Sequence, residues 1–362
     1  MSKQTNHQFC VVTYNLLSPS YVKPTYFPGI EKIHLDDEQR LKRTYKLLQK
    51  WINVKAIICL QELCEQWMQR FEKIFKDNNY RFDHTIYAKG KSGVSISYPI
   101  ELFDTMAVHI ASCFDEKKFE EIKNHTNNLQ ILTELANASV SENKYISVVV
   151  NVKTTGPFGL QRQTILLSTY HMPCRPLQKF FLVSHIHGLK ASLWDISQKY
   201  NCKHVILSGD FNITSKSQEY NFLALASRVD LLSTDTDHSA ENTKNINSAQ
   251  KKDVCKAQNN QDPEFIKEIK KIYDKLGHKL DSVLELQSSH LKLHGSEPIY
   301  TNVSVMSEGG MFIECLDYCL TTDTVQVIDC VVDLTVEDPC ASSYPNESCP
   351  SDHQPLITTL LF

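Results

Sequence analysis

The chain has 362 residues, and its 38 Lys and Arg against 42 Asp and Glu give a formal net charge of −4. Hydrophobic residues make up 41% and charged residues 22%, which excludes a chain that is disordered throughout. The 11 Gly and 13 Pro exclude a collagen-like chain. Because there is no basic excess, any contact with nucleic acid is expected to be short and helped by metal ions and base stacking.

The 12 cysteines are dispersed, with no CxxC pair and no zinc-finger spacing. Since disulfide frameworks belong to small secreted domains, this indicates a reduced, intracellular protein, with the cytoplasm as the expected compartment. The polar N-terminus has no signal core, and no apolar run reaches the ~18 residues of a membrane helix. No membrane association is therefore expected.

Short apolar runs alternate with helical patterns along the chain. Strand patterns cover residues 10–14, 56–60, 82–88, 94–98, 105–110, 146–152, 164–170, 204–208, 313–321, 325–334 and 356–362. Apolar residues recur at helical spacing over residues 36–52, 67–75, 176–200 and 264–280. Many strands with helices between some of them predict a layered α/β sandwich.

Two stretches interrupt this pattern. Residues 233–263 are rich in Asp, Asn, Lys, Gln and Ser, which predicts a long surface loop or a flexible insertion. Residues 114–143 are a weaker candidate for an insertion. Neither stretch requires a second domain, so residues 1–362 are expected to form a single catalytic domain.

Polar side chains follow the ends of many predicted strands, where rigid α/β scaffolds place reactive groups. They are Asn15, Glu62, His171, Asp210, Asn212 and Asp317, and Asp352 and His353 precede the last strand. Any one of them is more often a turn or cap residue, so the pattern is informative only as a set. His185 and His187 fall in a predicted helix and are interpreted as surface or satisfied core residues.

As a set, these residues suit phosphoryl transfer. Glu62 and Asp352 are hard oxygen ligands of the kind that Mg²⁺ or Mn²⁺ prefers. Histidines can transfer protons near neutral pH, and asparagines can hold phosphate oxygens or an attacking water. Phosphoryl transfer requires a metal, an in-line nucleophile and fixed donors that face the developing charge.

The order of six short peptides resembles the endonuclease/exonuclease/phosphatase superfamily. They are Tyr14-Asn15-Leu16-Leu17, Leu60-Gln61-Glu62, Tyr170-His171-Met172, Gly209-Asp210-Phe211-Asn212, Leu316-Asp317-Tyr318 and Pro350-Ser351-Asp352-His353. Together with Tyr300-Thr301-Asn302, they are similar to the branch that holds the carbon-catabolite-repressor deadenylases, nocturnin, Angel and 2′-phosphodiesterase. The resemblance extends from Asn15 to His353 and covers the catalytic domain of that branch.

This resemblance implies a four-layer α/β/β/α sandwich of two mostly antiparallel sheets flanked by helices. It implies Glu62 as the main Mg²⁺ ligand, supported by Asp352 and Asn15. Asp210 would orient or deprotonate the attacking water, and Asn212 would hold a phosphate oxygen. His171 would stabilise the pentacovalent phosphorus. His353, oriented by Asp317, would bind phosphate or transfer a proton.

The same resemblance implies a Mg²⁺-dependent phosphodiesterase, expected to be a 3′→5′ exoribonuclease acting on poly(A) or other RNA 3′ ends. Asn302 and Phe312 lie where the branch contacts the substrate's base, although Phe312 suits either base stacking or core packing. The alternatives are a 2′,5′-oligoadenylate phosphodiesterase, an NADP(H) 2′-phosphatase and, in another class, an inactive module that binds RNA or a deadenylase complex. The expected partner is thus an RNA 3′ end or an adenylate-containing nucleotide.

Overall fold

The computed structural model describes residues 8–114, 116–139, 141–153, 163–224, 263–275, 284–305, 310–333 and 344–362. The insertion predicted over residues 233–263 lies outside these ranges except for Pro263, which begins a helix.

The first six-stranded sheet has the strand order β13-β14-β1-β2-β4-β3. Its strands are β1 (Gln8–Asn15), β2 (Ile57–Gln61), β3 (Tyr80–Tyr87), β4 (Ser92–Pro99), β13 (Gln326–Val332) and β14 (Leu356–Leu361). The β1 strand pairs in parallel with β2 and antiparallel with β14, and the other pairs are antiparallel. The beginning and the end of the described chain therefore lie side by side in this sheet.

The second six-stranded sheet has the order β5-β6-β7-β8-β12-β9. Its strands are β5 (Phe103–Ser112), β6 (Lys144–Val152), β7 (Thr164–His171), β8 (His204–Asp210), β9 (Gln287–Ser288) and β12 (Asp317–Thr321). Only β7 and β8 pair in parallel among these strands. A two-stranded ribbon of β10 (Asn302–Val305) and β11 (Met311–Glu314) lies beside the sheets.

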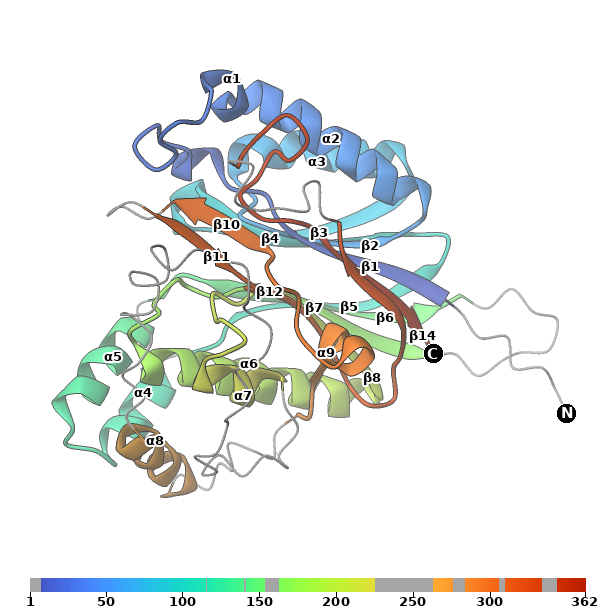
Figure 1. The fold of residues 1–362 in the computed structure, drawn as a ribbon. Helices are drawn as coiled ribbons and strands as arrows, with labels where there is room; N and C mark the ends of the chain where they lie inside the picture. The colour runs from blue at the N-terminus through green and yellow to red at the C-terminus, as the bar shows by residue number, and fades with distance from the viewer. Residues whose placement is uncertain are drawn as a thin grey trace, which may run out of the picture.

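Helices cover the outer faces of both sheets (Figure 1). On the first sheet lie α2 (Asp37–Asn53) and α3 (Glu65–Asp77), whose Trp51, Trp67 and Phe71 pack on residues of β1 and β2. On the second sheet lie α4 (Glu116–Lys123), α5 (Leu129–Ser139), α6 (Lys179–Tyr200), α7 (Gln218–Ala224) and α8 (Pro263–Lys275). The described ranges also contain two short α-helices, α1 (Lys32–Leu35) and α9 (Ser289–His294), and two short 3-10 helices, η1 (Pro19–Tyr21) and η2 (Ala88–Gly90).

The inner faces of the two sheets pack directly against each other. Residues of the first sheet, such as Ile57 and Ile96, belong to the same hydrophobic cluster as Val148 and Leu167 of the second. Apolar burial on this scale is the main force that holds such layers together. The four-layer α/β/β/α sandwich predicted from the resemblance is therefore confirmed.

Residues 313–321 do not form the single strand that their apolar run predicts. They divide into β11 of the ribbon and β12 of the second sheet. At the break, the backbone N–H groups of Leu316 and Asp317 both donate to the hydroxyl of Thr301 at 3.0 Å instead of to a neighbouring strand. The Thr301 side chain thus replaces the hydrogen bonds of a neighbouring strand at the point where the chain passes from the ribbon to the second sheet.

Residues 114–143, the weaker candidate for an insertion, contain regular structure. They form α4 and α5, and Ile122, Ile131 and Leu135 are buried in the hydrophobic cluster that contains α6. His185 of α6 is a buried core residue: its Nδ1 lies 2.7 Å from the Tyr170 hydroxyl, and its Nε2 has no hydrogen-bond partner among the described residues. Burial lowers the pKa of His185 to about 3.

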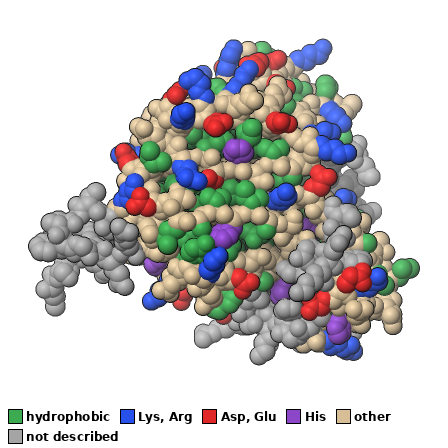
Figure 2. Space-filling model, turned by 180° about the vertical axis from the view of Figure 1, so that it is seen from behind, with side chains coloured by type: hydrophobic (Ala, Val, Ile, Leu, Met, Phe, Trp, Pro, Cys, Tyr) green, Lys and Arg blue, Asp and Glu red, His purple; other side chains and the backbone are tan. Residues whose placement is uncertain are grey.

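The face of the molecule seen in Figure 2 carries interspersed acidic and basic side chains. This agrees with the formal charge of −4. None of the helices in the described ranges has both the length and the apolar composition needed to cross a membrane.

Candidate active site

Strand register brings the predicted site residues to one edge of each sheet. In the second sheet Asp210 lies opposite His171 of β7 and also opposite Asp317 of β12. In the first sheet Asn15 ends β1 beside the end of β2, directly before Glu62. Because parallel strands end at the same edge, both sheets present their polar residues at one end of the sandwich.

Asn15 links the two sheets at this edge. Its Nδ2 donates to Glu62 Oε1 at 3.1 Å and to Asp210 Oδ2 at 2.9 Å. Its Oδ1 accepts the backbone N–H of Leu17 at 2.9 Å, which fixes the orientation of the amide. Asn15 therefore presents its amide N–H donors to the carboxylates, and its support of a metal stays a prediction.

Glu62 follows β2 with a left-handed backbone, at φ 56°. Its Oε2 accepts the backbone N–H of Ser18 at 2.7 Å, and its Oε1 lies 3.9 Å from His171 Nε2. The carboxylate thus has a neighbour at both oxygens, and the Glu62 side chain is 13% exposed to solvent. It remains accessible to a cation or to substrate.

Asp210 is the buried centre of the site. Its Oδ1 accepts the backbone N–H of Asn212 at 2.9 Å, and its Oδ2 lies 3.6 Å from Nε2 of both His171 and His353. Gly209 makes this position possible, because it has φ 152° and an added Cβ would lie 1.9 Å from the Tyr170 carbonyl oxygen. The β7 and β8 strands can approach closely only with glycine at this point.

Asn212 has φ 49°, a left-handed conformation that asparagine tolerates better than most residues. Its Nδ2 donates to the Met172 carbonyl at 2.8 Å and lies 3.3 Å from His171 Nε2. The short turn after Asp210 thus places a neutral amide beside the histidine ring.

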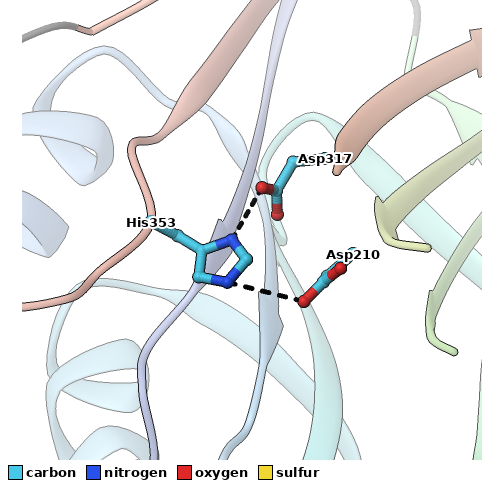
Figure 3. Close-up of side chains that lie close together, drawn as sticks. All are labelled: Asp210, Asp317 and His353. Carbon is cyan, nitrogen blue, oxygen red and sulfur yellow. Dashed lines mark hydrogen bonds and ion pairs between the residues drawn. The ribbon is translucent and has the colours of Figure 1, made fainter. Parts of the chain in front are cut away.

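His353 lies between two carboxylates (Figure 3). Its Nδ1 is 2.7 Å from Asp317 Oδ2, and its Nε2 faces Asp210. Burial alone would lower the pKa of His353, but Asp317 and Asp210 outweigh it and raise this pKa well above the ordinary value. The two carboxylates thus favour the protonated form of the ring, which suits it to bind a phosphate oxygen or to donate a proton.

Asp352 precedes this histidine and is a high-pKa carboxyl group. Burial raises its pKa to about 6; His353 opposes the shift, and the charge of Glu62 adds to it. The main-chain carbonyl of Asp352 accepts the backbone N–H of Val303 at 2.8 Å and the Asn302 amide at 3.4 Å. Asn302 thus supports the loop that carries Asp352 and His353.

Phe312, the second predicted substrate contact, lies on β11 opposite Ser304. It is half-buried, and the hydrophobic clusters of the described residues do not include it. The ribbon therefore leaves Phe312 outside the packed core.

The donor set fits a hard divalent cation. Glu62 raises the pKa of Asp352, so these two carboxylates repel each other, and a cation bound by them would relieve this repulsion. Their oxygen ligands match Mg²⁺ or Mn²⁺. The ligand atoms of Asp210, Asp317 and His353 also lie within 4.8 Å of one another, but hydrogen bonding and ion pairing already account for that closeness. Glu62 and Asp352 would therefore hold the metal, which would polarise a phosphoryl oxygen.

Sequence reasoning assigned no role to three further residues that support the site. Thr301 donates to Asp317 Oδ2 at 2.7 Å, and Ser351 donates to the Asn15 carbonyl at 2.8 Å. Gln61 Nε2 donates to the hydroxyls of Thr13 and Thr169, both at 3.0 Å, and so joins the two sheets directly beneath the site. Each of the three comes directly before a residue with a predicted role in the site, and this position in the sequence is the signal that could have identified it.

A two-sheet sandwich with carboxylates, histidines and amides gathered at one end defines the phosphodiesterase and phosphatase class of α/β fold. The chain belongs to the Endonuclease/Exonuclease/phosphatase family, whose model matches residues 12–353. Members of this class are hydrolases of phosphate esters. No curated protein sequence was found to match the chain.

Solved structures share the fold at low sequence identity. ANGEL2, described as a 2′,3′-cyclic phosphatase and bound to adenosine-2′,3′-vanadate, matches with a TM-score of 0.66 and 16% identity over 100% of this chain and 97% of its own. The human nocturnin catalytic domain with bound sulfate matches with a TM-score of 0.57 and 14% identity, over 98% and 97%. A family protein from Bacteroides thetaiotaomicron matches with a TM-score of 0.56 and 13% identity, over 99% of both chains. The family model thereby confirms the predicted superfamily, and these structures share its fold.

Proposed function

We propose that this chain is a Mg²⁺-dependent phosphodiesterase that acts at RNA 3′ ends, as a 3′→5′ exoribonuclease on poly(A) or similar tails. The observation that carries the proposal is the position of Asp210, whose Oδ2 faces Nε2 of His171 and of His353 at 3.6 Å each. A carboxylate between two imidazoles can accept the proton of a water while the rings contact the phosphate that this water attacks.

Each side chain then has a defined part in the hydrolysis. Asp210 orients the attacking water and takes its proton, with Asn15 holding the carboxylate. His171 and the Asn212 amide contact phosphate oxygens as charge develops on them. The His353 ring, oriented by Asp317, binds a phosphate oxygen or protonates the leaving oxygen in its protonated form, which Asp317 and Asp210 favour.

The surface charge favours a short, single-stranded substrate. The formal charge of −4 gives no basic excess, which favours a substrate held by few phosphate contacts over a long duplex held by many. Stacking and the bound metal would supply the affinity instead. Phe312, half-buried and outside the core clusters, is the candidate for stacking, and Asn302 is the candidate polar contact.

The test is a gel of 5′-labelled RNA that ends in poly(A), incubated with the purified protein and Mg²⁺. We expect a ladder of shortened tails that EDTA abolishes. Glu62→Ala should lower kcat by about 100- to 1,000-fold, the usual effect of removing one group that stabilises the transition state. Glu101→Ala is the matched control, because Glu101 is an exposed acid beyond the opposite end of β4. RNA that stays uncut would refute the exoribonuclease proposal.

A second candidate is hydrolysis of a 2′,3′-cyclic phosphate at an RNA 3′ end. It is favoured by the alignment of the whole chain with ANGEL2, which is described as a 2′,3′-cyclic phosphatase. The chemistry is again attack of water on phosphorus, but the RNA keeps its length. An RNA that loses its cyclic phosphate without being shortened would select this candidate. Parallel reactions with 2′,5′-oligoadenylate and NADP(H) test the two remaining enzymatic alternatives, and inertness toward all four substrates would support an inactive binding module.

A further inference from the structure

Arg40 of α2 is a fully buried arginine next to the site but outside the set of catalytic side chains. Its exposure is 0%, and its guanidinium carbon lies 5.3 Å from the centre of the Trp67 ring. Burying a guanidinium is costly unless its donors find partners. Two of its three guanidinium nitrogens find partners among the described residues and Nη1 does not, so the partners of Nε and Nη2 indicate its role.

All its hydrogen bonds in the described structure go to main-chain carbonyls of two separate loops. Nε donates to the Pro350 carbonyl at 2.8 Å, and Nη2 donates to the Leu16 carbonyl at 2.8 Å and also to the Leu17 carbonyl. Pro350 is more than 330 residues along the chain from Leu16. One planar group thus holds together the loop after β1 and the loop before β14.

These two loops carry the groups expected to hold the metal. On the first, the backbone N–H of Leu17 orients Asn15, and the backbone N–H of Ser18 holds Glu62 Oε2 at 2.7 Å. On the second, Pro350 is followed by Ser351 and then by Asp352. A small separation of the loops would therefore move Asp352 away from Glu62.

An arginine is suited to this task and a lysine is not. The guanidinium presents its donors in one rigid plane, so it can serve Pro350 and the Leu16–Leu17 turn at the same time, whereas an ammonium is a single point on a flexible stem. Burial lowers the pKa of Arg40, but the charges of Asp352 and Glu62 oppose this, and a guanidinium remains charged in proteins. Its charge thus also attracts the two carboxylates without an ion pair to either.

We propose that Arg40 is a positioning residue that fixes the distance between Glu62 and Asp352 by clamping the two loops, and so sets the affinity for the divalent cation. The inference rests on the proposed function, because it requires that these carboxylates bind Mg²⁺ or Mn²⁺. The clamp and the positive charge of Arg40 have opposite effects on the affinity for the cation: the clamp strengthens binding, whereas a nearby positive charge by itself weakens it. Replacing Arg40 with lysine keeps the charge and removes the fork, which separates the two effects.

The experiment measures Mn²⁺ and Mg²⁺ binding to the wild-type protein and to Arg40→Lys by calorimetry, and the rise in Tm that each metal causes. We expect Arg40→Lys to weaken metal binding by about 10- to 100-fold, as for other residues that orient metal ligands, and to raise the Mg²⁺ concentration needed for half-maximal activity. Thr44→Val is the matched control, because Thr44 is buried one turn along α2 and donates only to the Arg40 carbonyl.

The outcomes separate the clamp from the function. Metal binding by Arg40→Lys equal to that of the wild type would overturn the clamp, as would an equal weakening by Thr44→Val. If Arg40→Lys does not fold, Arg40→Gln, which lacks both the charge and the reach to join the two loops, is measured instead. Because loss of the charge alone would strengthen cation binding, weaker binding by Arg40→Gln supports the clamp, and equal or tighter binding overturns it. A wild-type protein that binds neither metal would refute the metal-dependent function itself, and the clamp with it.

Discussion

Replacing Thr301 with valine is expected to slow the reaction although Thr301 touches no substrate. Its hydroxyl donates to Asp317 Oδ2 at 2.7 Å and accepts the backbone N–H groups of Leu316 and Asp317 at 3.0 Å each. Asp317 in turn orients His353. Valine has nearly the same shape as threonine, so Thr301→Val removes these three hydrogen bonds and leaves the packing in place.

The size of the effect follows from these contacts. A hydrogen bond to a charged group contributes roughly 1.5–3 kcal/mol. If that support is lost in the transition state, kcat falls about 10- to 150-fold, since ~1.4 kcal/mol is a factor of ten. The two backbone N–H groups left without an acceptor cost about 1–3 kcal/mol each in free energy of unfolding. Thr301→Val should therefore be both slower and less stable.

The assay is kcat and KM at saturating Mg²⁺, alongside denaturant unfolding of the same preparations. Thr301→Ser keeps the hydroxyl and should retain most of the rate, which separates the hydrogen bonds from the loss of the methyl group. We expect kcat to fall with little change in KM. A Thr301→Val protein that is destabilised but has the wild-type kcat per folded molecule would refute the reasoning, since Thr301 would then serve the fold alone.

Three further predictions concern pH, backbone conformation and metal. The pKa of His185 falls from 6.5 to about 3 on folding, so only the unfolded state gains its proton as the pH drops below 6.5. Between pH 7 and 5, the free energy of unfolding of the wild type should therefore fall by about 2 kcal/mol more than that of His185→Gln. Denaturant unfolding at both pH values measures this difference. Asn212→Ala and Asn212→Gly should lose kcat equally, but the alanine variant should be about 1 kcal/mol less stable because of its positive φ; equal stability would contradict this. EDTA should lower the Tm of the wild type in Mg²⁺ and leave that of Glu62→Ala unchanged, since a ligand stabilises only the state that binds it.

The sequence could locate the site because its residues stand at the ends of strongly apolar strands. Glu62 and Asp210 each follow such a run, and the parallel pairs β1–β2 and β7–β8 bring these ends together. The resemblance carried by the family peptides then implied two mostly antiparallel sheets between helices, an arrangement that the apolar runs alone do not reveal. This is why the layers and the location of the polar residues were predictable.

The features of the fold and the site that were not predictable depend on contacts between residues far apart in the sequence. The break between Glu314 and Asp317 is made by the Thr301 hydroxyl, so no local pattern marks it. The orientation of the Asn15 amide depends on the Leu17 backbone and on carboxylates from both sheets. The burial of Arg40 depends on a loop more than 300 residues away. These are properties of the assembled fold and leave little trace in local periodicity.

The position of β1 between β2 and β14 affects how the nascent chain can fold during synthesis. Synthesis proceeds from the N-terminus, and domains fold as their segments emerge. One side of β1 can pair with β2 early, but the other side stays open until Leu356–Leu361 has left the ribosome. His353 emerges just before that strand. The nascent chain thus completes its first sheet and its catalytic centre at almost the same moment, and until then it presents a bare strand edge that chaperones would have to protect.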